Sequence, residues 1–209
     1  MRPGIHILLG LLFLSPAVGR AAEGFQVYES TAASVNGEVI FLSEVAREVC
    51  FLRCAAMPGS AEEILSAREA RDRLILDTLA LQEQRKLLLG TVDNVALEGY
   101  VREADSRMAA CASSCKQEIA PGETREWIRR KLLLRDFFNR RVAVFVEVKD
   151  EDVQKEFARR SSAPGDGEDL TWEQVRDEML DARITREVRN WQTRAASKSK
   201  LILSPMGER

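Results

Sequence analysis

Four cysteines, arranged as two C-x3-C pairs, constrain the fold of this 209-residue chain more than any other feature. Cys50 and Cys54 form the first pair, and Cys111 and Cys115 form the second. Residues four apart on a helix have Cβ atoms about 5–6 Å apart, whereas a disulfide needs a Cβ separation of about 3.8 Å. Bonding within a pair would distort its helix, so we expect two disulfides that join one helix to another. In the chain-entropy model, the first such bond closes a loop of about 57 residues and stabilises the fold by roughly 4 kcal/mol.

A redox-active dithiol and a four-cysteine metal site are the alternatives to structural disulfides. Redox motifs are typically C-x-x-C, and zinc sites usually place their C-x2–4-C knuckles on turns rather than on helices. The spacing therefore favours structural disulfides, and we expect no metal and no other cofactor.

The first 21 residues have the pattern of a secretory signal peptide. Arg2 precedes an apolar run over residues 5–18, and small residues follow at Gly19 and Ala21. We expect cleavage after Ala21 or, as second choice, after Gly19. The apolar run is short for a membrane anchor, so the mature chain is expected not to span a membrane. Export to an oxidising compartment agrees with an even number of cysteines.

Charge and histidine content narrow the function classes. The chain has 31 basic and 33 acidic residues, a net charge of −2, which does not favour a nucleic-acid partner. Its single histidine, His6, lies in the predicted signal peptide. A mature chain without histidine excludes Ser-His-Asp and Cys-His catalysis and histidine-ligated metals. Carboxylate or lysine chemistry survives this exclusion, but no phosphate-binding loop or metal motif accompanies it, so we expect no enzyme.

The remaining pattern predicts a mostly α fold with a small β-hairpin and a short C-terminal strand. Asn36-Gly37 lies between β-branched arms and predicts a type I′ hairpin over residues 34–40. Ser43 is expected to cap the first helix, and capping boxes at Ser60 with Glu63 and Thr171 with Gln174 to open two more. The predicted helices span residues 43–53, 60–89, 93–112, 123–138, 150–160 and 171–197, with an extended or buried connector at 142–148 and a strand at 201–203 that pairs with the hairpin.

Five short motifs follow one another along residues 33–204: 33–40 (ASVNGEVI), 42–45 (LSEV), 73–77 (RLILD), 129–136 (RRKLLLRD) and 146–153 (VEVKDEDV). In this order they resemble the chaperone core of the SurA and parvulin-type foldases of the periplasm. The last motif is similar to the family's V-x-V-[ST]-D-E-E-V. The resemblance implies a SurA N-terminal-like helical chaperone domain whose final helix packs back on the core.

The chain departs from that family where a parvulin isomerase domain would stand. Only the polar linker 161–169 occupies that place. We therefore predict a signal peptide at 1–21, a helical chaperone-like domain at 22–160, the linker, and a C-terminal helix and strand at 170–209 that complete the same domain. Prolyl isomerase activity is not carried over.

The resemblance implies a periplasmic protein that binds unfolded or partly folded exported proteins in an apolar groove between helices. A role in outer-membrane biogenesis is a further implication of the family. The candidate client-binding residues are aromatic side chains, each of which also suits a helical core: Trp127, Phe137, Phe138, Phe145, Phe157, Trp172 and Trp191. The basic clusters at 129–131 and 140–141 are interpreted as solvated helix faces.

Two disulfide connectivities satisfy the interhelical geometry. Cys50–Cys115 with Cys54–Cys111 is nested and requires antiparallel helices, whereas Cys50–Cys111 with Cys54–Cys115 requires parallel helices. Strict up-down alternation of three helices favours the parallel arrangement. The nested connectivity resembles that of twin C-x3-C helical hairpins, and this resemblance favours it.

Two other functions compete with a chaperone that acts on many clients. The chain could be a structural or adaptor subunit that binds one folded partner within an envelope or secretion complex. An isomerase or a redox enzyme is the third hypothesis. The sequence does not determine the client or the oligomeric state.

Overall fold

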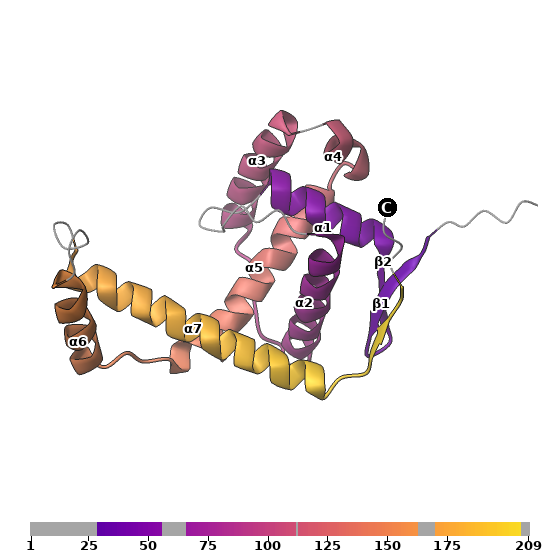
Figure 1. The fold of residues 1–209 in the computed structure, drawn as a ribbon. Helices are drawn as coiled ribbons and strands as arrows, with labels where there is room; N and C mark the ends of the chain where they lie inside the picture. The colour runs from indigo at the N-terminus through magenta and orange to yellow at the C-terminus, as the bar shows by residue number, and fades with distance from the viewer. Residues whose placement is uncertain (1–28, 56–65, 112, 163–169, 206–209) are drawn as a thin grey trace, which may run out of the picture.

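The fold is mostly helical with one small antiparallel sheet, as the sequence predicts, and the sheet lies at one side of the helices (Figure 1). The computed structural model describes residues 29–55, 66–111, 113–162 and 170–205. The predicted signal peptide, the Ser60–Glu63 capping box and most of the 161–169 linker lie outside these residues. In chain order the elements are β1 (Thr31–Val35), β2 (Glu38–Phe41), α1 (Leu42–Cys54), α2 (Ala67–Leu87), α3 (Asn94–Ala110), α4 (Ser113–Glu118), α5 (Glu123–Arg141), the 3-10 helix η1 (Ala143–Phe145), α6 (Asp150–Ser161), α7 (Trp172–Ser197) and β3 (Leu201–Leu203).

The sheet joins the two ends of the described chain. Its strand order is β2-β1-β3, and both pairings are antiparallel. Asn36 and Gly37 have φ of 53° and 92°, which is the positive φ that a type I′ turn requires. The Asn36 side chain also donates to Gln82 Oε1 of α2 at 2.8 Å and accepts from the Lys200 backbone N–H at 2.9 Å. The predicted hairpin and its pairing with the C-terminal strand are both confirmed.

Two helices begin at other residues than predicted, because a different residue is the N-cap of each. Glu44 accepts from the Phe41 backbone N–H at 2.8 Å, so α1 begins at Leu42 with Phe41 as its N-cap, and Ser43 does not cap it.

The start of α2 also differs. Ser66 forms a capping box with Glu69 and has extended backbone, with ψ of 159°. An unbroken helix from residue 60 to residue 89 is therefore wrong, because Ser66 is a non-helical N-cap and α2 begins at Ala67. The Thr171–Gln174 capping box opens α7 as predicted.

The body of the molecule packs α1, α3 and α5 together on one side and α1, α2 and the sheet on the other. Helix α7 crosses this body beside α2 with its C-terminal half (Figure 1). Its N-terminal half leaves the body and packs with α6 around Val148, Val153 and Val175. We refer to α6 with this half of α7 as the arm.

The connector between α5 and the arm is only partly buried. Val142 and Val148, at its two ends, are buried. Between them η1 exposes Val144 and Phe145, which keep 69% and 77% of their accessible surface. The prediction of an extended or buried connector is therefore wrong for Ala143–Phe145, which form a 3-10 helix with exposed side chains at Val144 and Phe145.

Within the described residues, every helix is too short or too polar to cross a bilayer.

Candidate functional site

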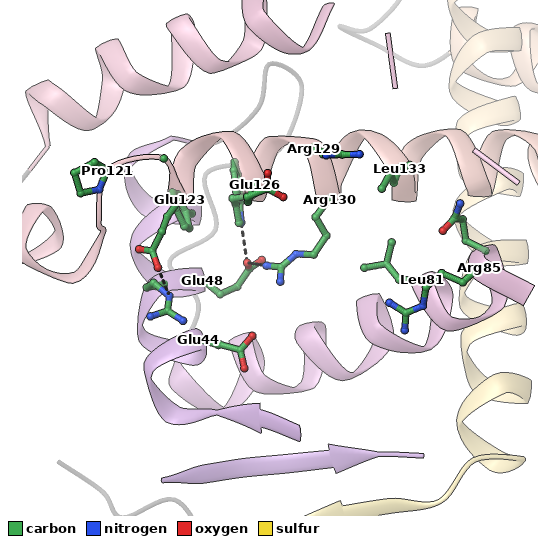
Figure 2. A pocket seen from close by; sticks show the side chains of 15 residues that line it. Glu44, Glu48, Leu81, Arg85, Pro121, Glu123, Glu126, Arg129, Arg130 and Leu133 are labelled. Atoms are coloured by element: carbon green, nitrogen blue, oxygen red, sulfur yellow. Dashed lines mark hydrogen bonds and ion pairs between the residues drawn. The ribbon is translucent and has the colours of Figure 1, made fainter. Parts of the chain in front are cut away.

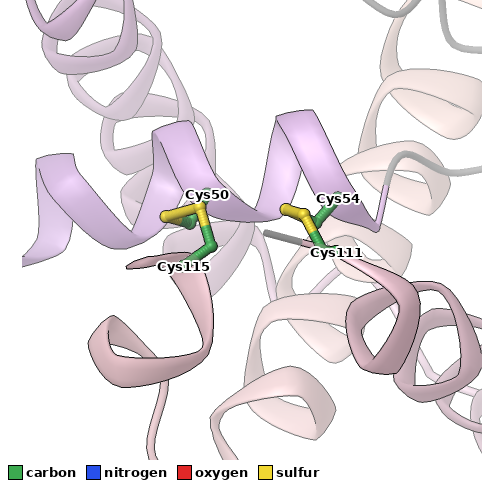
Figure 3. Close-up of a disulfide and its surroundings, with 4 residues drawn as sticks. All are labelled: Cys50, Cys54, Cys111 and Cys115. Atoms are coloured by element: carbon green, nitrogen blue, oxygen red, sulfur yellow. A yellow bond between two sulfur atoms is a disulfide. The ribbon is translucent and has the colours of Figure 1, made fainter. Parts of the chain in front are cut away.

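Two disulfides fasten α1 to the end of α3 and to α4 (Figure 3). Cys50 bonds to Cys115, and Cys54 bonds to Cys111, with Cα separations of 5.3 and 5.5 Å. This is the nested connectivity. The bonds join different helices, as the spacing predicts, and three of the four cysteines belong to the core between α1 and α5.

The second C-x3-C pair does not lie on one helix. Cys111 is the C-cap of α3 with extended backbone, at ψ of 168°, and Cys115 lies in the short helix α4. The chain turns between them, so the two sulfur atoms reach successive turns of α1 without parallel or antiparallel packing of two long helices. The Sγ atoms of Cys54, Cys111 and Cys115 lie within 4.8 Å of one another. All three are in disulfides, so none is a thiolate that could bind a metal.

A cavity of about 760 Å³ lies between α1, α2 and α5 (Figure 2). Its floor is apolar: the rings of Phe51 and Trp127 stack with centroids 4.9 Å apart, and Leu81 and Leu133 also line it. Its rim carries charges of both signs, because the lining residues include Glu44, Arg47, Glu48, Arg85, Glu123, Glu126, Arg129 and Arg130.

Glu48 is the central charged group of this cavity. Its side chain is fully buried, and it accepts from Trp127 Nε1 at 2.8 Å and from Lys131 Nζ at 2.7 Å. Arg130 Nη2 donates to it at 3.1 Å. Lys131 also pairs with Asp77 of α2 at 2.7 Å. One carboxylate therefore connects α1 to α5, and Lys131 extends the network to α2.

Burial by itself would raise the pKa of Glu48, because a desolvated carboxylate is less stable. The charges of Lys131 and Arg130 and the hydrogen bonds from Lys131 and Trp127 outweigh this, so the pKa lies below its usual value. A carboxylate held ionised by three donors is a poor general acid or base near neutral pH. The geometry favours a structural role for Glu48. Arg130 and Lys131 belong to this network, so the interpretation of residues 129–131 as a solvated helix face is wrong for these two.

Two grooves lie on different faces of α7, where it crosses α2 and α5. The first, which we call the apolar groove, has a volume of about 660 Å³. Leu76 of α2 and Leu134 and Phe138 of α5 form its floor. Its rim contains Glu69, Asp72, Arg73, Asp77, Lys131, Arg135, Arg189 and Gln192.

The second groove, which we call the basic groove, has a volume of about 760 Å³ and lies near the C-terminal ends of α2, α5 and α7. Leu79, Trp191 and Ala195 supply its apolar surface. Trp191 and Phe138 pack edge to face with centroids 5.4 Å apart, above the buried ring of Phe137. This cluster holds α7 on α5, and its two outer rings each line one of the grooves.

The predicted client-binding aromatics fall into three groups. Trp127 and Phe137 are 4% and 0% exposed and pack in the core, so the expectation that they are exposed is wrong; Trp127 nevertheless borders the cavity between α1, α2 and α5. Phe145 is the exposed member. The others are half-buried, with Phe138 and Trp191 beside the grooves and Phe157 and Trp172 in the arm.

Sequence reasoning did not identify Glu48 as the centre of a buried network. A signal was available, because Glu48 falls three residues after Val45 and four before Leu52, which are both buried. A carboxylate at an apolar position of a helix needs a partner in the core, and only the fold shows that α5 supplies it.

Neither a family model nor a curated protein matches the chain. The likeness to SurA and the parvulin-type foldases therefore depends on the sequence motifs alone.

Proposed function

We propose that this is an exported, periplasmic chaperone-like protein that binds unfolded or partly folded exported proteins without isomerising their prolines. The observation that carries the proposal is the apolar groove between α2, α5 and α7. A long apolar side chain of a client fits a floor of Leu76, Leu134 and Phe138, while the charged rim stays in water. Such a surface binds apolar segments without requiring one sequence.

The arm extends the surface that a client can contact. Phe145 and Val144 are exposed in the connector between α5 and α6. Exposed apolar groups of this kind often mark interaction sites. Export is supported by the signal-like residues 1–21 and by the two disulfides, which persist in oxidising compartments.

Suppression of aggregation tests the proposal. The chain without residues 1–21 is mixed with a chemically unfolded outer-membrane protein, and light scattering is followed at rising chaperone ratios. We expect suppression at near-stoichiometric ratios. Leu76→Glu places a charge on the floor of the apolar groove and should abolish most of it, whereas Val95→Glu, at an exposed apolar residue of α3 outside the grooves, should not. Equal thermal stability of the two variants is the control for folding.

Absence of suppression by the unmodified chain would contradict the proposal. Turnover in a prolyl isomerase assay or an insulin reduction assay would favour an enzyme instead, and we expect neither.

The adaptor hypothesis is favoured by a different surface. Val39 of β2 and Ile202 of β3 both pair with Ser34, so they share the same sheet face, and they are 41% and 53% exposed. An exposed sheet face suits one folded partner. Capture of a single partner at fixed stoichiometry would favour this function over the chaperone.

A further inference from the structure

The basic groove carries more positive charge than an acidic chain of this kind leads one to expect. Five basic side chains and one carboxylate line it, although the whole chain has a net charge of −2. The carboxylate is Glu83, and the basic residues are Arg85, Lys86, Arg141, Arg194 and Lys198.

The helix dipole explains why basic residues occur at these helix ends, but not why the ends of three helices lie close together. Arg85, Lys86, Arg141 and Arg194 lie in the last turns of their helices, and Lys198 is the C-cap of α7. Cations stabilise the negative end of a helix dipole. That effect acts separately on each helix. Their gathering around one apolar floor, formed by Leu79, Trp191 and Ala195, is a property of the tertiary structure.

Three of these cations are uncompensated. Arg85 pairs with Glu38 at 2.7 Å, and Lys86 lies 4.0 Å from Glu83. Arg141, Arg194 and Lys198 are exposed, and none of them forms an ion pair within the described part of the chain. A positive concave surface of this kind attracts and orients a negatively charged ligand.

We propose that the basic groove binds an acidic segment of a client protein, one that carries an apolar or aromatic residue beside its carboxylates. Arg194 lies in the last turn of α7 and Lys198, four residues later, is its C-cap; residues at this spacing on a helix have Cβ atoms about 5–6 Å apart. Alternate residues of an extended chain lie on one side at a spacing of about 6.8 Å. Two acidic residues at i and i+2 therefore match the two cations, while a neighbouring apolar side chain reaches Trp191.

The size and composition of the groove select this occupant. A volume of about 760 Å³ is in the range that buries a ligand of drug size, so it accommodates a short segment rather than a folded domain. A free phosphate would satisfy the cations but leave the apolar floor empty. A peptide that combines carboxylates with an apolar residue uses both.

The inference rests on the proposed chaperone function and names the class of segment it recognises. The test measures binding of a fluorescent peptide of extended Asp/Glu and Phe/Leu pattern to the chain without residues 1–21, by fluorescence anisotropy. The matched ligand is the same peptide with Asn and Gln in place of Asp and Glu. We expect the acidic peptide to bind at least tenfold more tightly, and the difference to shrink in high salt because ions screen exposed charges.

The matched variants carry the same change in net charge. Arg194→Glu with Lys198→Glu reverses two cations of the groove. Arg186→Glu with Lys155→Glu reverses two exposed cations outside both grooves. We expect the first pair to weaken binding of the acidic peptide at least tenfold and the second pair less than twofold.

Equal binding of the acidic and amide peptides, or an equal loss in both variants, would overturn the inference. Binding of phosphatidylglycerol vesicles or inorganic phosphate without binding of the peptide would also overturn it. A client without acidic segments distinguishes failure of this inference from failure of the proposed chaperone function. If suppression of its aggregation is present while the acidic peptide does not bind, only this inference fails; if both are absent, the proposed function fails as well.

Discussion

The body of the molecule and the arm are stabilised by different interactions. In the body, two disulfides hold α1 against α3 and α4, and the buried carboxylate of Glu48 joins α1 to α5. In the arm, α6 and α7 pack around the valine cluster and are joined by surface ion pairs. A region with few buried side chains opens locally at a lower free energy than a cross-linked core. The arm is therefore the part of the fold that opens most easily, and the body is the frame that holds the grooves; under the proposed function, the arm is the part that adjusts to a client.

Removing both disulfides should produce the largest loss of stability. Replacing all four cysteines with serine frees the chain that the bonds close into loops, and we expect the free energy of unfolding to fall by about 4 kcal/mol or more. Urea unfolding followed by circular dichroism measures this. A loss below about 1 kcal/mol would show that packing, rather than the cross-links, stabilises the body.

Removing the buried carboxylate should have the next largest effect. Glu48→Ala leaves Lys131 and the Trp127 N–H without this partner in the core, and we expect a loss of about 3 kcal/mol. The control is Glu103→Ala, which breaks the exposed pair with Arg107 and should cost below about 0.5 kcal/mol. Similar losses in the two variants would remove the distinction between a buried network and surface pairs.

Low pH should destabilise the body by protonating the Glu48 carboxylate. The pKa of Glu48 in the folded protein lies below its ordinary value of 4.5, so ionised Glu48 stabilises the fold above pH 4.5. That contribution is lost as the pH falls through the lower pKa of the folded state. We expect the stability of the unmodified chain to fall with pH in this window more steeply than that of Glu48→Gln. Parallel pH profiles of the two proteins would contradict this.

A substitution in the core of the arm should cause a smaller loss of stability, confined to the arm. Val153 is fully buried between α6 and α7. Val153→Ala removes two methyl carbons and should cost about 1.5 kcal/mol. Hydrogen exchange should show faster opening of α6 and the N-terminal half of α7, with exchange in α1 and α5 unchanged. Uniform acceleration over the whole chain would show that arm and body open together.

Removing a surface contact of the arm should lower the free energy of unfolding least. Arg183 donates to the Glu147 carbonyl and pairs with Asp152, both at 2.8 Å. We expect Arg183→Met to lower the free energy of unfolding by about 0.5 kcal/mol, an effect that added salt reduces. Urea unfolding at low and high salt measures it. A loss as large as that of Val153→Ala would show that ion pairs, and not the valine cluster, hold the arm.

The sequence predicts the features of the fold that depend on neighbouring residues. Asn36 and Gly37 form the hairpin turn because they tolerate positive φ, and Thr171 with Gln174 opens α7 because each satisfies a free N–H of the other. Competing caps limit this reasoning: Ser60 and Ser66 both precede a glutamate by three residues, and only the described structure shows that a helix begins after Ser66.

The cysteines show both what the sequence alone determines and what it leaves open. Their spacing and the geometry of a disulfide are local facts, so bonds between different helices follow from the sequence. The break of the chain at Cys111, the partners of Glu48, and the meeting of three helix ends at the basic groove depend on tertiary structure. Trp127 lies 79 residues from Glu48, and at that separation the contact is set by how whole helices pack, which no short sequence pattern specifies.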